Sequence, residues 1–282
     1  MKPGRGSLLL LSPAGAVFLG LFFLPMAGLL IESFRLYVPG SIGSKADAPF
    51  TFANYGELLT PSFARFFFET LRVSLLASLI GLLFAFPLAY WITRRLAARW
   101  QPIIIGLFVT LMFLSVLVRT YALELTFGAV GPLRPLLVEI GISPNSRGYI
   151  EILVVAGLLH YIVPMATLTL LGTIQNVDPR LFDAAQALGA PRWKAILSVT
   201  LPLCMRGLLA AFLFAFTFSI SAFVIPMILG KGRVLFISNL IYTRFSEIAN
   251  YPSGAAISIV LFVVAIAIVY GMSHLVNRRW KT

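Results

Sequence analysis

The 282-residue chain has few charged residues, few acidic residues and a single cysteine. Only 11% of its residues are charged, whereas a soluble domain carries about 25%, so most of the chain must face lipid or other apolar helices. The lone cysteine, Cys204, excludes an intramolecular disulfide and offers no metal cluster. Two histidines and ten acids do not form the convergent constellation that a membrane enzyme needs at one membrane face.

The sequence also lacks a GxxxxGK[ST] phosphate-binding loop, so the chain cannot hydrolyse ATP by that route. Its net charge is +12, but no polar basic domain is present to carry nucleic-acid binding. The basic excess is instead typical of the loops that flank membrane helices on their cytoplasmic side. We therefore expect no nucleic acid, no metal and no cofactor to bind this chain.

Long apolar segments dominate the sequence, which is 59% hydrophobic. A spanning helix needs about 20 apolar residues, and six segments qualify: Leu8–Ile31, Leu71–Thr93, Ile103–Val118 or slightly beyond, Ile152–Ile174, Leu203–Leu229 and Ala255–Val276. The first exceeds the roughly 7–15 residues of a signal-peptide core, so we expect it to be retained. We predict an all-α membrane protein with six transmembrane helices in a single domain, 1–282.

Lysine and arginine are divided unevenly between the segments that connect these spans. The short segments 1–7, 94–101, 175–206 and 277–282 carry 12 basic residues and two acids. The alternate, longer segments carry ten basic residues and eight acids. Because cytoplasmic loops hold the excess of basic residues, we predict that the first set and both termini are cytoplasmic.

The polar stretch 178–202 has the pattern of two short helices joined by a glycine. Asp178 suits the N-cap, and Pro179 suits the first helical position because its missing N–H would have no partner there. Gly189 stands where a left-handed residue ends a helix, and a second helix is predicted from Pro191. One face of the first helix carries Leu181, Ala184, Ala185 and Leu188. The second repeats this pattern with Trp193, Ile196, Leu197 and Leu201, before Pro202 opens the next apolar segment.

Four elements of this stretch resemble the cytoplasmic EAA loop of permease subunits in binding-protein-dependent ABC importers. These elements are Asp183-Ala184-Ala185, Gly189, Ile196 and Leu201-Pro202, with Asp where the motif usually has Glu. Other stretches are similar to the polyamine (spermidine/putrescine) branch of these permeases. They are Leu117–Tyr121, Phe52–Tyr55, Val224–Gly230 and Asn250–Ala256.

The resemblance implies the MetI-like permease fold of the bacterial inner membrane, with a core at about 67–276 and coupling helices at about 178–202. It implies a complex with two copies of an ABC ATPase that binds ATP and Mg, usually a second, related permease, and a periplasmic solute-binding protein. The implied function is translocation of a small solute, a polyamine or a related organic molecule. The implied ATPase-coupling residues are Leu181, Asp183, Ala184, Ala185, Leu188, Gly189 and Pro202.

Candidate pathway or gate residues are Arg119, Tyr121, Ser219 and Ser221, and each has a structural alternative. Arg119, at the end of the third span, can instead snorkel to the interface, and serines commonly pack helices and satisfy backbone groups near a proline. Glu124 and Glu151 are expected to be solvated near the outer surface, and His160 to be buried and hydrogen-bonded.

A stand-alone channel or secondary carrier is the alternative function. Such a carrier typically has inverted repeats or charge pairs within the membrane. Neither is visible in this sequence, which favours the importer permease.

Overall fold

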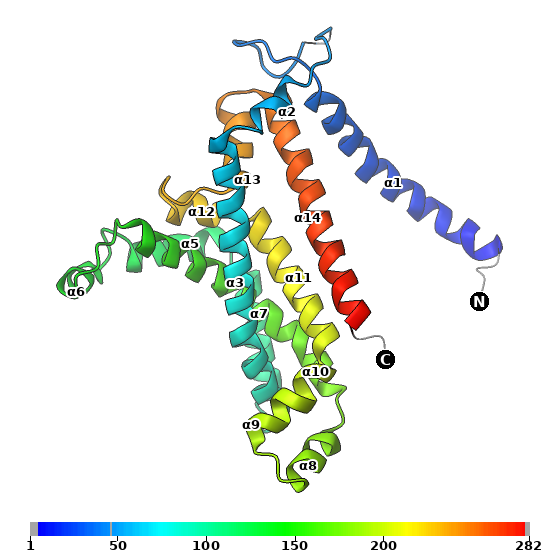
Figure 1. Ribbon diagram of the computed structural model, residues 1–282, viewed down its shortest axis with the longest axis vertical. Helices are drawn as coiled ribbons and strands as arrows, with labels where there is room; N and C mark the ends of the chain where they lie inside the picture. The colour runs from blue at the N-terminus through cyan, green and yellow to red at the C-terminus, as the bar shows by residue number, and fades with distance from the viewer. Residues whose placement is uncertain (1–4, 46, 280–282) are drawn as a thin grey trace. The chain divides into compact units, whose positions relative to one another are not determined.

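The computed structural model describes residues 5–45 and 47–279, and within them it contains helices, turns and two isolated bridges but no named strand (Figure 1). The prediction of an all-α protein is therefore confirmed. The chain divides into two compact units, Met1–Arg65 with Leu240–Val264 and Phe66–Asn239 with Ala265–Thr282. The single domain expected over 1–282 stays a prediction.

The first unit contains α1 (Arg5–Ser33), α2 (Ala53–Glu57) and the beginnings of α3 (Pro61–Arg94) and α14 (Tyr251–Arg279). The loop between α1 and α2 is held by the antiparallel bridges Arg35↔Phe50 and Tyr37↔Ser44. Asn54 is buried, and its side-chain amide donates to the carbonyls of Ser33 and Arg35, both at 2.9 Å. Asn54 thus satisfies carbonyl groups that are left without helical partners where α1 ends.

The start of α14 is fixed by the Asn250 side chain, whose Oδ1 accepts from the Ser253 N–H at 3.0 Å. Gly254 follows, and a Cβ there would lie 2.8 Å from the Phe245 ring, which only glycine tolerates without a shift. Asn54 and Asn250, which belong to two of the stretches similar to the polyamine branch, therefore stabilise the end of α1 and the start of α14.

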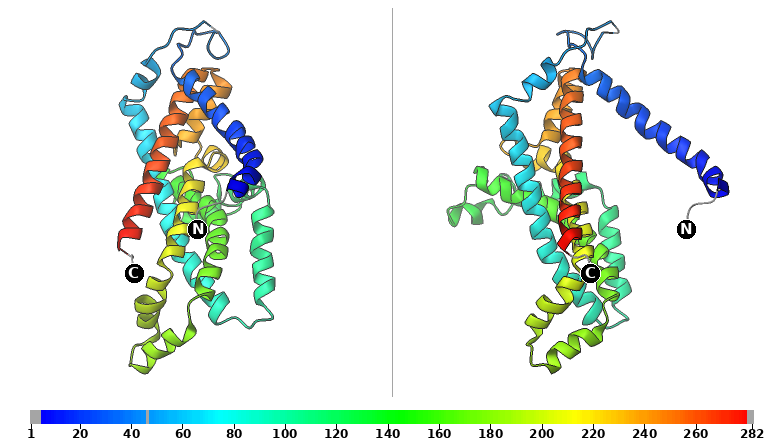
Figure 2. Two further views of the ribbon diagram at one scale, coloured as in Figure 1. Left: turned by 90° about the vertical axis from the view of Figure 1, so that its right-hand side faces the viewer. Right: turned by 45° about the vertical axis from the view of Figure 1, so that its right-hand side comes forward.

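In the second unit α7 (Arg147–Gln175) is the central helix. It packs against α11 (Met205–Ser221), α4 (Gln101–Phe113), α5 (Val116–Phe127) and α12 (Val224–Leu229), and α4 lies beside it in both views of Figure 2. Apolar residues recur along the buried face of α7, and the fully buried ones include Leu158, Ile162, Leu170 and Ile174.

Two predicted spans are broken. Helices α4 and α5 meet at 91°, because Leu114 and Ser115 between them are extended. The predicted span Ile103–Val118, or slightly beyond, is therefore not one straight helix but the bent pair α4–α5. The predicted span Leu203–Leu229 is likewise divided, since α11 ends before the extended Ala222 and α12 follows.

By length and composition, four helices of the described chain can cross a membrane, or up to six if each bent pair forms one span. These four contain most of the predicted spans Leu8–Ile31, Leu71–Thr93, Ile152–Ile174 and Ala255–Val276. The other pair joins the stretch Arg192–Leu203 to α11 at 74°. Shorter helices complete the fold: α6 (Arg134–Glu139), α13 (Ile237–Tyr242) and the π-helix η2 (Thr243–Glu247).

Candidate functional site

The stretch 178–202 forms the helix pair α8 (Pro179–Ala187) and α9 (Arg192–Ala195) at one end of the second unit (Figure 1). The Asp178 carboxylate accepts from the Arg180 N–H at 2.9 Å, as expected for an N-cap. Gly189 has φ +88, and its N–H donates to the Gln186 carbonyl at 2.9 Å. The Ala190 N–H donates to the Ala185 carbonyl at 3.1 Å, which completes a Schellman motif. Both predicted helix ends are thus confirmed.

The predicted apolar face of α8 is largely uncovered by the described residues of this chain. Leu188 is 90% exposed and Leu181 is 47% exposed, while Ala184 is exposed and Ala185 half-buried. Burying a leucine side chain stabilises a protein by about 1.5–3 kcal/mol. The face is therefore a surface on which a partner would gain stability.

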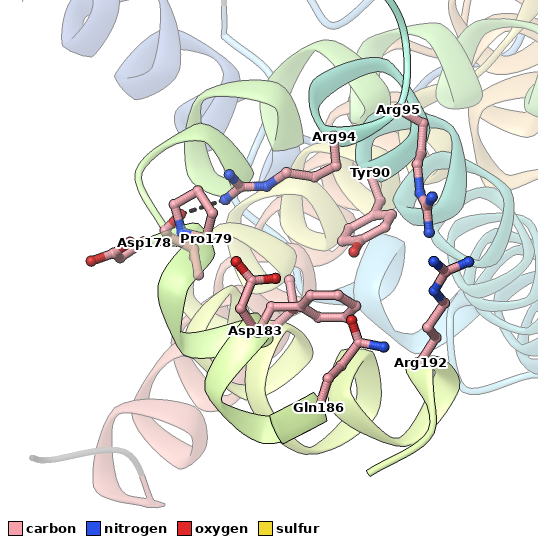
Figure 3. Close-up of a pocket in the computed structure, with 11 residues that line it drawn as sticks. Tyr90, Arg94, Arg95, Asp178, Pro179, Asp183, Gln186 and Arg192 are labelled. Carbon is pink, nitrogen blue, oxygen red and sulfur yellow. Dashed lines mark hydrogen bonds between the residues drawn. The ribbon is translucent and has the colours of Figure 1, made fainter. Parts of the chain in front are cut away.

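The other side of α8 faces the end of α3 across a pocket of about 270 Å³ (Figure 3). Asp183 and Gln186 line this pocket, together with Tyr90, Arg94, Arg95 and Arg192. The Arg94 guanidinium donates to the Ile174 carbonyl at 2.7 Å and also to the Val177 carbonyl. Arg94 therefore ties the end of α3 to the end of α7, directly before α8 begins.

The helix that follows Gly189 is irregular. It continues from α9 into a π-helical turn, η1 (Ile196–Thr200), and then α10 (Leu201–Leu203). Pro202 has no N–H for the Ser198 carbonyl, which prevents a regular α-helical bond there. The apolar segment predicted to open at Pro202 continues as α11 from Met205, beyond the 74° bend.

Arg119 lies in α5 and is only 8% exposed. Its guanidinium donates to the Leu114 carbonyl at 2.9 Å and its central carbon lies 5.6 Å from the Tyr161 ring centre. Arg119 thus caps a carbonyl freed by the α4–α5 break, and its role as an interfacial anchor stays a prediction. Arg119 Nε and His160 Nδ1 are buried without a hydrogen-bond partner among the described residues, so the bond expected at His160 is missing at that atom.

The other candidate pathway residues differ in how far they are buried. Tyr121 is 49% exposed. Ser219 is buried and its hydroxyl donates to the Ala215 carbonyl at 2.8 Å. Ser221 is exposed and donates to the Thr217 carbonyl at 2.9 Å. Both hydroxyls are thus engaged by their own helix, and the pathway role of all four residues stays a prediction.

Acidic residues of the second unit form ion pairs with arginine or lysine residues far away in the sequence. Glu151 pairs with Arg72 and Glu124 with Lys231, both at 2.6 Å, so the expectation that these acids are solvated is wrong. A third pair, missed at the sequence level, joins Arg147 to Glu69 at 2.6 Å, with the Glu69 side chain only 7% exposed. Its partners are 78 residues apart, and no local pattern identifies such a pairing.

The broken apolar helices around α7 and the exposed pair α8–α9 define a multi-pass membrane subunit with a surface suited to a partner protein. Residues 58–282 match the family described as "Binding-protein-dependent transport system inner membrane component". The chain belongs to this family and is a permease subunit of an ABC importer.

Individual relatives agree with this assignment. The chain is 31% identical over 236 residues to the spermidine/putrescine transport system permease protein PotB of Haemophilus influenzae, with 82% of each chain covered. It is 28% identical to PotB of Escherichia coli K12, covering 82% of this chain and 85% of that one. A chain of a bacterial alginate ABC transporter, solved in complex with an alginate-bound periplasmic protein, shares the fold with a TM-score of 0.76 at 22% identity, covering 97% of this chain and 94% of the other.

Proposed function

We propose that this permease translocates a polyamine, or a related small organic solute, that a periplasmic binding protein delivers. The observation that carries the proposal is the likeness to a spermidine/putrescine permease over 82% of both chains. The family membership leaves the alternative, a stand-alone carrier or channel, without support.

In this proposal ATP and Mg bind to the partner ATPase. The conformational change of the ATPase is transmitted to α8. Closure of the ATPase subunits presses on the exposed face at Leu181 and Leu188. Ala184 and Ala185 allow close backbone approach, while Asp183 carries the charge of the motif on the pocket side. Because Arg94 joins α3 to the end of α7, a displacement of α8 passes to two spanning helices.

Both termini lie in the cytoplasm in this proposal, and the membrane is the bacterial inner membrane. The basic segments 94–101 and 175–206 meet through the Arg94 hydrogen bonds, which supports their location on one side. The described carboxylates of Glu69, Glu124 and Glu151 pair elsewhere in the unit. A second, related permease completes the pair of membrane subunits.

A small organic anion is the second candidate solute, and one observation favours it. The Arg119 guanidinium is buried and its Nε has no partner among the described residues. A buried positive charge near the pathway would repel a polyamine and attract an anion.

The test is uptake of labelled spermidine, putrescine and organic anions by cells that lack their own polyamine uptake. The cells express the permease with its ATPase, second permease and binding protein, and matched cells omit only this permease. Polyamine uptake that requires this chain and the binding protein supports the proposal. Uptake of an anion alone, at normal abundance of the complex, would contradict it.

A further inference from the structure

An apolar groove adjoins the pocket beside α8, and the proposed coupling does not use it. The groove has a volume of about 550 Å³ and runs between α3 and the stretch from α9 to α10. Its walls are apolar and aromatic side chains, among them Leu83, Phe86, Trp193 and Leu197. Tyr90 lines both the groove and the basic pocket, so the two cavities meet at this side chain.

The groove is open to the surroundings of the chain. Leu83 is 69% exposed, Trp193 is 64% exposed and Leu197 is 53% exposed. No described side chain fills the space between them. An apolar occupant would therefore bury several large side chains at once, each worth about 1.5–3 kcal/mol when fully covered.

The adjoining pocket contains two arginines whose charges are not neutralised within the described chain. The guanidinium groups of Arg95 and Arg192 point toward one another (Figure 3). The ion pairs found among the described residues all involve other side chains. Asp183 also lines the pocket but lies nearer Arg94 in the close-up. Two facing cations favour an anion between them, because each guanidinium presents a fork of donors that matches phosphate.

We propose that an anionic phospholipid binds here, with its phosphate between Arg95 and Arg192 and an acyl chain in the groove. Arg95 directly follows the end of α3, a helix long and apolar enough to cross the membrane. Basic pockets between membrane helices are suited to anionic headgroups, and tyrosine at the boundary is typical of the membrane interface.

Charge distinguishes this occupant from a helix of the second permease. An apolar helix would fill the groove equally well but would leave the two guanidinium groups facing each other. A single lipid molecule places its phosphate in the basic pocket and its acyl chain in the apolar groove. Its binding holds the stretch from α9 to α10 against α3, independently of which solute is transported and of which membrane side the loop faces.

The test uses a photo-crosslinking amino acid, benzoylphenylalanine, in place of Leu197 in the complete importer in native membranes. The adducts are identified by mass spectrometry, and the same substitution at Leu107, 54% exposed on α4, is the reference site. Because a basic side chain near a membrane surface attracts anionic lipid by about fivefold, phosphatidylglycerol or cardiolipin adducts at 197 should exceed those at 107 by at least this factor.

Arg95→Gln with Arg192→Gln should remove the enrichment at position 197, while crosslinking at 107 checks that the complex still inserts. Arg99→Gln removes the same charge from the same basic segment outside the pocket, and should keep the enrichment. Three results would overturn the proposal: adducts to the second permease instead of lipid, lipid adducts in bulk membrane proportion, or enrichment that survives in the double variant.

Discussion

Replacing Gly189 by alanine isolates the contribution of backbone conformation to the coupling loop. Gly189 has φ +88, and a Cβ built there has no atom within 4 Å beyond its chain neighbours. Alanine would therefore meet no steric obstacle and would be strained only by the left-handed backbone. That strain is about 1–2 kcal/mol for a residue with a Cβ, which corresponds to a roughly 5–30-fold change in an equilibrium constant.

We expect Gly189→Ala to open the turn between α8 and α9 more often by this factor. Hydrogen exchange of peptides around 184–195 in the purified complex measures the local opening. Gly189→Asn should have a smaller effect, because asparagine visits the left-handed region more readily.

Gly172→Ala is the matched control for that experiment. Gly172 also has no atom within 4 Å of a built Cβ, but it lies inside α7 without a positive φ. Alanine is favoured there by about 0.5–1 kcal/mol, so exchange in α7 should slow or stay unchanged. Wild-type exchange in the turn of Gly189→Ala, or equally faster exchange in both variants, would contradict a role for the left-handed backbone at Gly189.

Three further predictions concern the rest of the chain. Arg119→Ala should lower the thermal stability of the complex, because a freed carbonyl at the α4–α5 break costs about 1–3 kcal/mol; a melting curve equal to wild type would exclude the capping role. Glu69→Gln should lower the free energy of unfolding of the chain by an amount near the lower end of about 1.5–3 kcal/mol, because the Arg147 side chain is 46% exposed and can bind water instead. An unchanged denaturation midpoint would show that the Glu69–Arg147 pair contributes nothing to stability. In a cysteine-free background, a cysteine at Ala190 should resist an impermeant thiol reagent in intact cells and one at Lys45 should react, whereas labelling at Ala190 would reverse the proposed orientation.

Signals that are local in sequence predicted the structure well. Asp178, Pro179 and Gly189 each act within about four residues of themselves, and the structure has an N-cap, a first helical residue and a left-handed end at those positions. Hydropathy also located the apolar segments, because membrane helices need long runs of apolar residues.

The breaks within these segments were not predictable by the same means. Leu114 and Ala222 are apolar residues inside apolar runs, yet both have extended backbone. Their carbonyls accept hydrogen bonds from the side chains of Arg119 and Ser238, respectively. Pairings over long separations, such as Glu69 with Arg147, likewise depend on how the helices pack. The pocket between the end of α3 and α8 arises in the same way, and no single stretch of sequence contains its residues.

We propose that the exposed face of α8 transmits to this permease the motion that ATP hydrolysis drives in the partner ATPase. Leu188 is 90% exposed in the isolated chain, so Leu188→Glu should change the stability of the chain by no more than about 0.5 kcal/mol. A charge placed against the partner ATPase would instead cost at least about 1.4 kcal/mol, or tenfold in binding.

The decisive measurement is the ATPase activity of the reconstituted importer with and without solute-loaded binding protein. Leu188→Glu should abolish the stimulation at normal abundance, while Ala98→Glu, which adds the same charge at an exposed position of segment 94–101, should leave it intact. Full stimulation and uptake with Leu188→Glu would contradict the assignment of α8 as the coupling element.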